Sequence, residues 1–319
     1  MKTATNGGSP HPTPAPAGTM RAIVQHNYGT APGDDLELAE VARPSIGDGE
    51  VLVRVRAASV DRGTWHLMTG RPNLMRIMGF GLRRPKQPNP GRSVAGTVEA
   101  VGGNVTAFEA GDEIYGTAEG SFAEYARADA GKLAPKPANL SFEQAAAAPV
   151  SGLTALQGVW RAQIGAGQQV LIIGASGGVG SFAVQIAKAL GAEVTGVCST
   201  AKLELVSKLG ADHVVDYTQE AFADGPRRYD VILDIGGNSR LSNLRRALAP
   251  AGRLVIVGGE TQGRWLGGFD RQIRAMLLSP WVGQKLGILT ASENAADLSV
   301  LGELLESGKI VPAIDRTYP

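Results

Sequence analysis

The stretch QVLIIGASGGVGSFAVQIAKALGAEVTGVC, residues 169–198, decides the fold of this chain. It opens with an apolar run at 169–175 that is typical of a buried strand, followed by a glycine-rich loop. Residues 181–190 then carry an apolar stripe at helical spacing, which stops at Gly191 before a second apolar run at 193–198. Strand, loop, helix and strand in this order predict two parallel strands joined by a crossover helix.

The same alternation continues on both sides of this stretch. On the N-terminal side, SFEQAAAAPVSGLTALQGVW (141–160) has helical character with an interruption at Pro149. On the C-terminal side, helices are predicted at 201–209 and 240–249, and strands at HVVDY, YDVILDI and RLVIVGG. This order predicts an α/β fold, with a Rossmann-type, doubly wound parallel sheet over residues 149–290.

The first half of the chain has a different pattern, with short strand signals separated by turns. EVLVRVRAASV (50–60) alternates apolar and charged residues, which indicates a half-buried strand. Residues 91–108 predict two strands joined by a Gly-Gly-Asn turn. Between them, 61–90 is rich in Arg, Pro and Gly and is predicted to be a long irregular loop. We expect a mostly β domain over 20–148, preceded by a disordered, proline-rich tail at 1–19.

Length and composition limit the function classes that remain. With 319 residues the chain has room for two domains, and 31 Lys and Arg against 30 Asp and Glu give a net charge of +1. That balance gives no reason to expect a nucleic-acid partner or an anionic-membrane surface. The single cysteine, Cys198, excludes a disulfide within the chain and any zinc site that needs several thiolates. We find no signal peptide and no membrane-spanning segment, so we expect a cytoplasmic protein.

The strongest chemical signal is the glycine-rich loop that follows the strand at 169–175. Its sequence, Gly174-Ala-Ser-Gly177-Gly178-Val-Gly180, lacks the side chains that would keep a ligand away from the backbone. Backbone N–H groups and a helix N-terminus at such a loop bind an anion, and a dinucleotide pyrophosphate is the usual one. In its strand–loop–helix context we interpret the loop as a dinucleotide-binding site; the alternative is a glycine-rich turn without a ligand.

The residues after the second strand bear on which dinucleotide binds. An NAD site usually carries Asp or Glu about 20 residues after the glycines, at the end of that strand. Here the strand is followed by Ser199, Thr200 and Lys202, with no carboxylate. Two hydroxyls and an ammonium suit a 2′-phosphate, so NADPH is favoured over NADH. The alternative is that Ser199 or Thr200 caps the helix at 201–209 and Lys202 is a solvated residue.

Several stretches of the chain are long and specific enough to be compared with known families. They are AAAAPVSGLTALQG (145–158), GASGGVGSFAVQIAKALGAEV (174–194), LGADHVVDY (209–217), DGEVLVRVRAASV (48–60), ANLSFEQAA (138–146) and GKIVPAIDRTYP (308–319). Together they resemble the medium-chain dehydrogenase/reductase superfamily, and most closely its zinc-independent quinone oxidoreductase branch. The resemblance implies a GroES-like, mostly β catalytic domain at 20–148, to which 291–319 returns with a late strand at 308–319. It implies a Rossmann domain at 149–290.

The resemblance also implies site residues. Asp61 and His66 fall where the branch often carries an Asn and a Tyr, so they are expected to line the acceptor pocket. Lys202 and Tyr217 match the pair that binds the 2′-phosphate and its ribose. Ser199 is a further candidate for binding the same part of the cofactor. The remaining cofactor-binding candidates are Ser176, Gly177, Gly178 and Val179 at the pyrophosphate, and Thr154, Gly258 and Gly259 at the nicotinamide.

At the positions of the zinc branch's ligands, the chain has other residues. Asp61 stands where that branch has a Cys, Gly91-Arg92-Ser93 replaces its Gly-His-Glu motif, and Ser151 lies near the place of its second ligand Cys. Catalytic zinc normally takes three Cys, His or Glu ligands, so no metal is expected. Without a Lewis acid to ionise an alcohol, the expected reaction is reduction of an activated acceptor by hydride from NADPH. A quinone or an α,β-unsaturated carbonyl is such an acceptor.

Two alternatives to a quinone or enone reductase stay open. The first is an enoyl-thioester reductase of the same superfamily. The second is a catalytically weak nucleotide-binding protein, because the chain stops at Pro319, where the family continues with one further helix–loop–strand unit. A homodimer is expected from the resemblance, since dimers through the edge of the Rossmann sheet are usual in the family.

Several residues also admit a plain structural role. Asp61 is expected to bind backbone N–H groups and hold its loop, with repulsion of an anionic product as the alternative. His66 is either a donor to the acceptor's carbonyl or an exposed loop histidine. The basic run Arg83-Arg84-Pro85-Lys86 is interpreted as a solvated loop, with attraction of acidic substrates as the alternative. The apolar segments 265–269 and 274–283 either line the acceptor pocket or pack against a second subunit.

Overall fold

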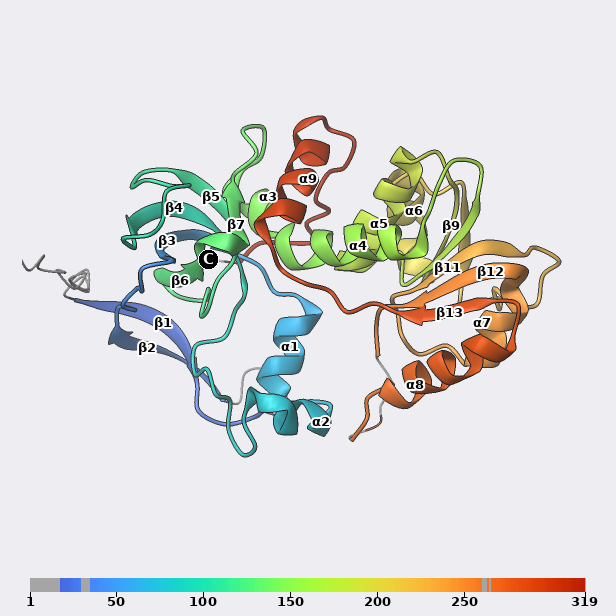
Figure 1. Ribbon diagram of the computed structural model, residues 1–319, viewed down its shortest axis with the longest axis horizontal. Coiled ribbons are helices and arrows are strands. Elements are labelled where there is room, and N and C mark those ends of the chain that lie inside the picture. The colour runs from blue at the N-terminus through green and yellow to red at the C-terminus, as the bar shows by residue number, and fades with distance from the viewer. Residues whose placement is uncertain (1–17, 30–34, 260–262, 264, 319) are drawn as a thin grey trace, which may run out of the picture.

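Two lobes make up the structure, a computed structural model that describes residues 18–29, 35–259, 263 and 265–318. A β-rich lobe holds the first half of the chain and a helix-flanked sheet holds the second (Figure 1). The mostly β part and the parallel α/β part expected from the sequence are both confirmed. Of the tail predicted to be disordered, residues 1–17 lie outside the described part of the chain.

Short antiparallel strands form the β-rich lobe. Their bounds are Thr19–Gln25 (β1), Leu36–Ala42 (β2), Glu50–Ala58 (β3), Ser93–Val101 (β4), Glu113–Thr117 (β5), Tyr125–Asp129 (β6) and Leu133–Pro135 (β7). One sheet has the order β6-β3-β4-β5-β7, and β1 pairs with β2. The alternation expected at 50–60 is confirmed from Val53 onward, where Arg54 and Arg56 are exposed; at the start of β3, Leu52 is buried as well, on the opposite face.

Parallel strands form the second lobe. Their bounds are Gln169–Ile173 (β8), Glu193–Cys198 (β9), His213–Asp216 (β10), Tyr229–Asp234 (β11), Leu248–Ile256 (β12) and Lys285–Ile288 (β13). They lie in the order β10-β9-β8-β11-β12-β13, so the direction of strand addition reverses between β8 and β11. Doubly wound sheets bind nucleotides at the carboxyl ends of the strands beside this reversal.

Helices cover both faces of the parallel sheet, which explains why β8 is apolar along its length. Val170 and Ile172 of β8 pack towards one helix layer, and Leu171 and Ile173 pack towards the other. The first layer contains α4 (Pro149–Ala162), α5 (Gly178–Ala189) and α6 (Leu203–Lys208). The second layer contains α7 (Leu241–Ala247) and α8 (Phe269–Leu278) (Figure 1). The helical prediction for 141–160 is confirmed, with a short helix α3 (Phe142–Ala146) before Pro149 and α4 after it.

The prediction of an irregular loop over 61–90 is wrong for residues 62–80. The chain there forms α1 (Arg62–Thr69), α2 (Asn73–Met75) and a wide helical turn η1 (Arg76–Phe80). These helices are too short to show a helical period in the sequence, and the many Arg, Gly and Pro residues of the segment hide them. They bring 61–80 against the parallel-sheet lobe, as described below.

Two predicted strands do not form within the described residues. Within 91–108 only β4 is a strand, because the chain turns back at once: Asn104 N–H donates to the Asp48 carbonyl oxygen at 2.9 Å. Residues 308–318 form no strand either. They run beside α5, where the Gln185 side-chain amide donates to and accepts from the main chain of Val311 at 3.0 and 2.8 Å. A glutamine side chain here takes the place of a neighbouring strand.

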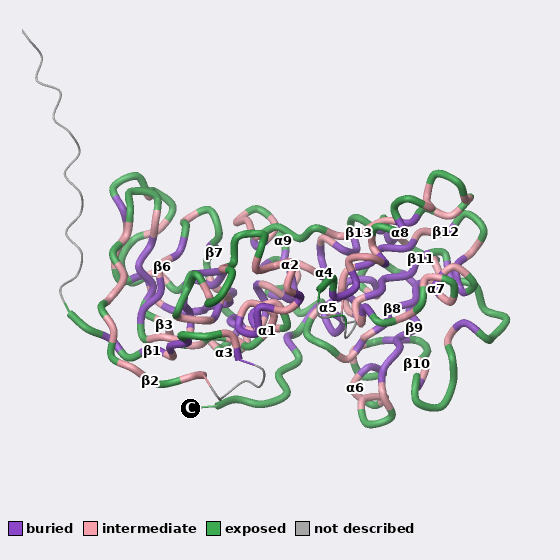
Figure 2. The backbone as a smooth tube through the Cα atoms, turned by 90° about the horizontal axis from the view of Figure 1, so that it is seen from below, coloured by how far each residue is buried: buried purple, intermediate pink, exposed green. Residues whose placement is uncertain are grey.

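Helix α9 (Ala295–Glu306) connects the two lobes by packing on α4 and β7. Buried Tyr115 of β5 donates its hydroxyl to the Leu298 carbonyl oxygen at 2.7 Å, and burial raises the pKa of Tyr115. The buried segments follow both sheets and the α4 and α5 helices (Figure 2). Among the described residues, no helix combines the length and apolar character needed to cross a membrane.

Candidate active site

The loop between β8 and α5 is built for close approach to its backbone. Gly174 has a φ of +86°, and a Cβ at Gly180 would lie 2.0 Å from the Gly174 carbonyl oxygen. The Gly177 N–H donates to the same carbonyl at 3.1 Å and closes the turn. Helix α5 begins at Gly178 without a side-chain cap, so the N–H groups of its first turn are available to an anion. This arrangement fits a dinucleotide pyrophosphate.

A cavity of about 810 Å³ extends from this loop to the β-rich lobe. One wall comes from α4 and from the loops at the carboxyl ends of the parallel strands, and the other from α1 and α2. Apart from Thr200 and Lys202, every candidate residue named from the sequence lines this cavity. These are Asp61, His66, Thr154, Ser176, Gly177, Gly178, Val179, Ser199, Tyr217, Gly258 and Gly259.

Asp61 begins helix α1 as its N-cap. Its Oδ1 accepts the Thr64 N–H at 2.9 Å, and its Oδ2 accepts the Thr64 hydroxyl at 2.9 Å. A carboxylate at this place satisfies an otherwise unpaired donor and interacts favourably with the positive end of the helix. Asp61 therefore has the holding role expected of it, and it fixes the start of the helix that carries His66.

His66 lies one turn further along α1, with its ring tied to the main chain. The Nδ1 atom is 2.7 Å from the Arg71 carbonyl oxygen. Because a carbonyl oxygen only accepts hydrogen bonds, Nδ1 carries a proton and donates it. In the neutral ring Nε2 is then an acceptor, so His66 can donate from Nε2 to a substrate oxygen only as imidazolium. Trp65 packs edge-on against this ring at 5.1 Å between centroids.

The cavity end at β9 and β10 differs from the sequence expectation. Ser199 makes no capping bond, and a short turn η3 (Thr200–Lys202) precedes α6. The Thr200 hydroxyl donates to Asp216 Oδ2 at 2.5 Å, and this bond lowers the pKa of Asp216. Sequence reasoning missed Asp216 because this carboxylate ends the neighbouring strand, opposite Cys198, rather than β9 itself. The helix-cap alternative for Ser199 and Thr200 is therefore wrong.

Lys202 lies just outside the residues that line the cavity. Its Nζ is 3.2 Å from Oδ1 of Asp315, which belongs to the segment after α9. The guanidinium of Arg316 and the ammonium of Lys202 both lower the pKa of Asp315, so this carboxylate is charged. A phosphate that approaches Lys202 therefore has to compete with Asp315.

A buried ion pair between Asp234 and Arg271 holds the floor of the cavity. Asp234 ends β11, and Arg271 comes from α8. The guanidinium also donates to the carbonyl oxygens of Ser239 at 2.8 Å and Gly258 at 3.2 Å, so it ties together the loops after β11 and β12. Burial raises the pKa of Asp234, and the Arg271 guanidinium acts against this rise. Sequence reasoning missed the pair, since two residues 37 positions apart form no local pattern.

Other lining residues were also missed by sequence reasoning. Asn238 and Ser239 lie in the loop after the carboxyl end of β11, which is a signal that the sheet rule could have used. Pro72 and Met75 come from the short helical segment taken for a loop. Phe269 lines the cavity, so part of the segment 265–269 has the pocket role given as one alternative.

Metal-ligating side chains do not gather in the described part of the chain. No group of three or more His, Cys, Asp or Glu side chains there could hold a metal ion. At the positions compared with zinc ligands, Asp61 caps α1 and Ser151 lines the cavity. Arg92 pairs with Glu293 at 2.5 Å.

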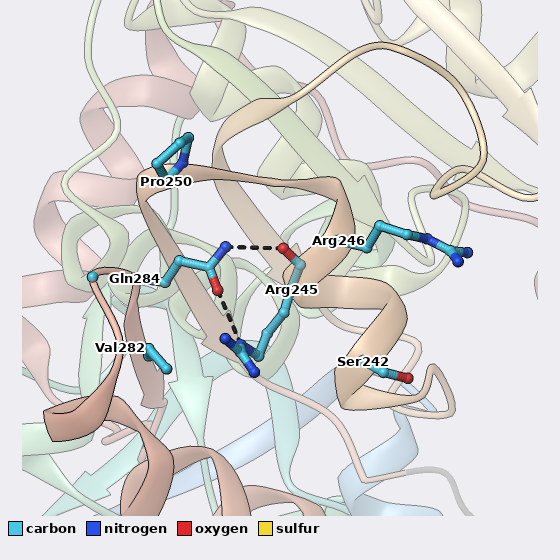
Figure 3. Close-up of a pocket in the computed structure, with 7 residues that line it drawn as sticks. Ser242, Arg245, Arg246, Pro250, Val282 and Gln284 are labelled. Atoms are coloured by element: carbon cyan, nitrogen blue, oxygen red, sulfur yellow. Dashed lines mark hydrogen bonds between the residues drawn. The ribbon is translucent and has the colours of Figure 1, made fainter.

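A second hollow lies beside α7 at the outer edge of the parallel sheet (Figure 3). Its polar groups are bound to each other: the Gln284 amide donates to the Arg245 carbonyl oxygen at 2.9 Å, and Arg245 Nε donates to Gln284 Oε1 at 3.1 Å. Arg246 pairs with Asp224 at 2.6 Å. Polar groups already used in this way do little to orient a ligand, so the cavity between the lobes is the candidate active site.

Comparisons with known proteins agree with this geometry. Residues 47–138 match the family described as alcohol dehydrogenase GroES-like domain, and residues 178–270 match the family described as zinc-binding dehydrogenase. The human quinone oxidoreductase is 31% identical over 94% of this chain and 90% of its own length. The chloroplastic NADPH-dependent alkenal/one oxidoreductase of Arabidopsis thaliana is 31% identical over 94% of this chain and 73% of its own length.

The solved structures give the same result. The quinone oxidoreductase from Coxiella burnetii has a TM-score of 0.79 and 27% sequence identity, covering 94% of this chain and 91% of its own. A GroES-like lobe and a Rossmann sheet around one shared cavity define a two-domain dehydrogenase or reductase. The chain belongs to the medium-chain dehydrogenase/reductase superfamily, among relatives named as quinone and alkenal/one oxidoreductases.

Proposed function

We propose that this protein is a zinc-independent oxidoreductase that uses NADPH to reduce a quinone or an α,β-unsaturated carbonyl. The observation that carries the proposal is the single cavity that links the glycine loop of the parallel sheet to α1 and α2 of the β-rich lobe. Hydride transfer requires donor and acceptor to be held in contact, away from bulk water. The names of the human and plant relatives support this class of acceptor.

A nicotinamide dinucleotide supplies the hydride when it is bound. In the proposal, the N–H groups of Gly178 and Val179 bind its pyrophosphate, and Thr154, Gly258 and Gly259 flank the nicotinamide. A Cβ at Gly258 would lie 2.0 Å from the Ile235 carbonyl oxygen, so glycine lets the loops after β11 and β12 stay in contact there. Asp234 and Arg271 hold these loops from beneath. They thereby position the side of the cavity formed by the parallel-sheet lobe, here called the cofactor wall.

In the proposal, the acceptor binds between the cofactor wall and helices α1 and α2, whose side of the cavity is here called the acceptor wall. Pro72, Met75 and Phe269 contribute apolar surface that excludes water from the reacting carbon. The reduced acceptor develops an oxyanion that takes up a proton. We assign this proton to solvent, because His66 uses its Nδ1–H for the Arg71 carbonyl and donates from Nε2 only when it is charged.

The preference for NADPH is the finer part of the proposal. Ser199 and Tyr217 line the cavity at its adenosine end, and Lys202 comes within reach of a 2′-phosphate when it leaves Asp315. A dianionic phosphate competes well for an ammonium that is otherwise bound to one exposed carboxylate. The name of the plant relative, which includes its dependence on NADPH, supports the same choice.

Steady-state oxidation of NADPH and of NADH with a panel of quinones and enones tests the proposal. Lys202→Met is expected to raise KM for NADPH about tenfold, the effect of one charge-assisted hydrogen bond, and to leave KM for NADH unchanged. Lys208→Met is the matched control, since Lys208 pairs with Glu204 on the exposed side of α6. Faster turnover with NADH, or equal changes for both cofactors, would contradict the NADPH assignment.

The acceptor panel also separates the remaining alternatives. Turnover restricted to enoyl thioesters would identify an enoyl-thioester reductase. Binding of NADPH without turnover on any acceptor would identify a nucleotide-binding protein without catalysis. The proposal predicts turnover with quinones or enones in the absence of added metal.

We also propose a homodimer that works in the cytoplasm, with domains at 20–148 plus 291–319 and at 149–290. Strand β13 forms one edge of the parallel sheet, and Trp281 beside it is exposed, which supports association there. Light scattering on the protein as it elutes from a size-exclusion column measures its mass in solution. A monomer at micromolar concentration would contradict the dimer.

A further inference from the structure

The segment 76–86, here called the basic–apolar loop, displays apolar side chains to solvent. Ile77 and Met78 are each 63% exposed, Leu82 is 70% exposed, and Phe80 is exposed as well. Single apolar side chains on a protein surface are ordinary, but four within six residues form a patch. Patches of this kind mark contact with a partner or a membrane.

The structure holds this loop in place from beneath. The Tyr28 hydroxyl lies 2.9 Å from the Phe80 carbonyl oxygen and 2.7 Å from that of Gly81. The Arg76 guanidinium stacks on the Tyr28 ring, 4.3 Å from its centroid. The Lys86 N–H donates to the Phe80 carbonyl oxygen at 3.0 Å and closes the loop. The exposed apolar residues are therefore presented by a backbone with defined contacts.

Charge in this part of the chain has one sign. Between Asp61 and Glu99 the sequence contains no carboxylate and seven Arg or Lys residues. These are Arg62, Arg71, Arg76, Arg83, Arg84, Lys86 and Arg92. Within the described ranges, no carboxylate forms an ion pair with Arg83, Arg84 or Lys86, and all three are exposed. Because the whole chain has a net charge of only +1, the basic–apolar loop is a local cationic site.

The loop directly continues the rim of the candidate active site. Pro72 and Met75, just before it, line the cavity. Leu74 N–H donates to the Trp265 carbonyl oxygen at 3.2 Å, so the segment leading into α8 meets the same rim from the other lobe (Figure 1). Trp265 and Leu266 are exposed there. Apolar side chains from both lobes thus flank the place where the lobes meet, with Arg83, Arg84 and Lys86 beside them.

We propose that the basic–apolar loop docks the protein on an anionic lipid bilayer. Its four apolar side chains would enter the boundary between headgroups and acyl chains, and its cations Arg83, Arg84 and Lys86 would face lipid phosphates. A nucleic acid would use the cations but leave the aliphatic side chains in water. A second copy of the chain in a symmetric contact would place like charges against each other. The bilayer is the partner that satisfies both sets of side chains.

Docking in this way turns the mouth of the cavity towards the membrane. Hydrophobic quinones and long-chain enones dissolve in the bilayer, so the acceptor class narrows to lipid-dissolved molecules. This second step rests on the proposed function, whereas the docking itself does not. The two can therefore fail separately.

Co-sedimentation of the full chain with vesicles tests the docking. The probes are phosphatidylcholine vesicles and vesicles with about 30 mol % phosphatidylserine. Arg83→Glu/Arg84→Glu removes the charge, and Ile77→Ser/Met78→Ser removes the apolar contact. The matched control is Arg227→Glu/Arg228→Glu, a second exposed arginine pair whose segment, 224–230, has no exposed large apolar side chain.

We expect the wild-type chain to bind the anionic vesicles at least about tenfold more tightly than the neutral ones, less so at high salt. Both loop variants lose most of this binding, and the control keeps it. Equal binding by the loop variants and the control overturns the proposal. So does tight binding of single-stranded RNA that only the charge variant removes, or a dimer that the Ile77→Ser/Met78→Ser variant dissociates while vesicle binding stays unchanged.

A vesicle-free assay keeps the proposed function separate. Both loop variants are expected to reduce a water-soluble quinone at the wild-type rate, because none of the four substituted residues lines the cavity. With a quinone dissolved in anionic vesicles, turnover by the variants falls in step with their binding. Equal turnover by wild type and variants on the lipid-dissolved quinone would overturn the narrowed acceptor class.

Discussion

The two walls of the cavity are made of different parts of the protein. The cofactor wall exposes backbone, since Gly174, Gly177 and Gly178 line the cavity without side chains. The acceptor wall is mainly side chains, among them His66 and Met75 on short helices. A wall of backbone leaves a fixed glycine spacing in the sequence. A wall of side chains is defined by local contacts that the sequence does not display.

The largest effect that we expect is on the cofactor wall, from Arg271→Met. The substitution leaves Asp234 buried without its partner and frees the carbonyl oxygens of Ser239 and Gly258. Loss of one member of a buried ion pair costs about 3–5 kcal/mol in the free energy of unfolding, measured by urea denaturation. The control is Arg274→Met on the same helix, where the side chain is 76% exposed. Equal losses for both variants would show that the pair does not hold the wall.

A smaller effect separates two glycines of the segment between β8 and the first turn of α5. A Cβ at Gly180 meets the Gly174 carbonyl oxygen, so Gly180→Ala is expected to cost about 2 kcal/mol of stability. A Cβ at Gly177 would lie 3.5 Å from that oxygen, an ordinary contact, so Gly177→Ala should leave stability unchanged. It should instead weaken NADPH binding about tenfold, because the methyl group stands where the pyrophosphate approaches.

Fluorescence titration of the two glycine variants with NADPH measures their affinity for the cofactor, and urea denaturation measures their free energy of unfolding. Gly165→Ala serves as the reference, since a Cβ there meets no atom within 4 Å. Wild-type affinity in Gly177→Ala would mean that the loop does not hold the pyrophosphate. Exposed backbone would then not be what distinguishes the cofactor wall from the acceptor wall.

The smallest effect is expected on the acceptor wall, at Asp61. Loss of the N-cap in Asp61→Ala should cost about 1 kcal/mol of stability and lower turnover through a displaced α1. Asn caps helices as well as Asp, so Asp61→Asn should keep both properties close to wild type. If Asp61→Asn keeps its stability but loses turnover, the carboxylate takes part in the chemistry rather than in holding the helix.

The elements that carry the cofactor wall could be predicted from the sequence, whereas the short helices and the long-range contacts could not. The strand β8 and the helix α5 could be predicted because their apolar residues repeat over long, uninterrupted stretches. Helix α1, with eight residues, is too short for its period to show. Asp216 reaches Thr200 from a neighbouring strand, and Asp315 reaches Lys202 from 113 positions further along the chain. Such contacts depend on tertiary structure, so sequence spacing could not reveal that Lys202 pairs with Asp315.

The contact between the lobes at the cavity mouth has a consequence for the timing of turnover. Gly267 has a φ of +50°, and a Cβ there would lie 2.8 Å from the ring of Pro72, so the two chains touch tightly beside the Leu74–Trp265 hydrogen bond. Within the described residues, the lobes are therefore in contact around α4 and α9 and again at this contact. Two lobes that touch at two separate places cannot move apart until one of these contacts breaks. We expect a small acceptor to enter and leave without that release, whereas exchange of a molecule as long as a dinucleotide needs it, so departure of the spent cofactor sets the pace.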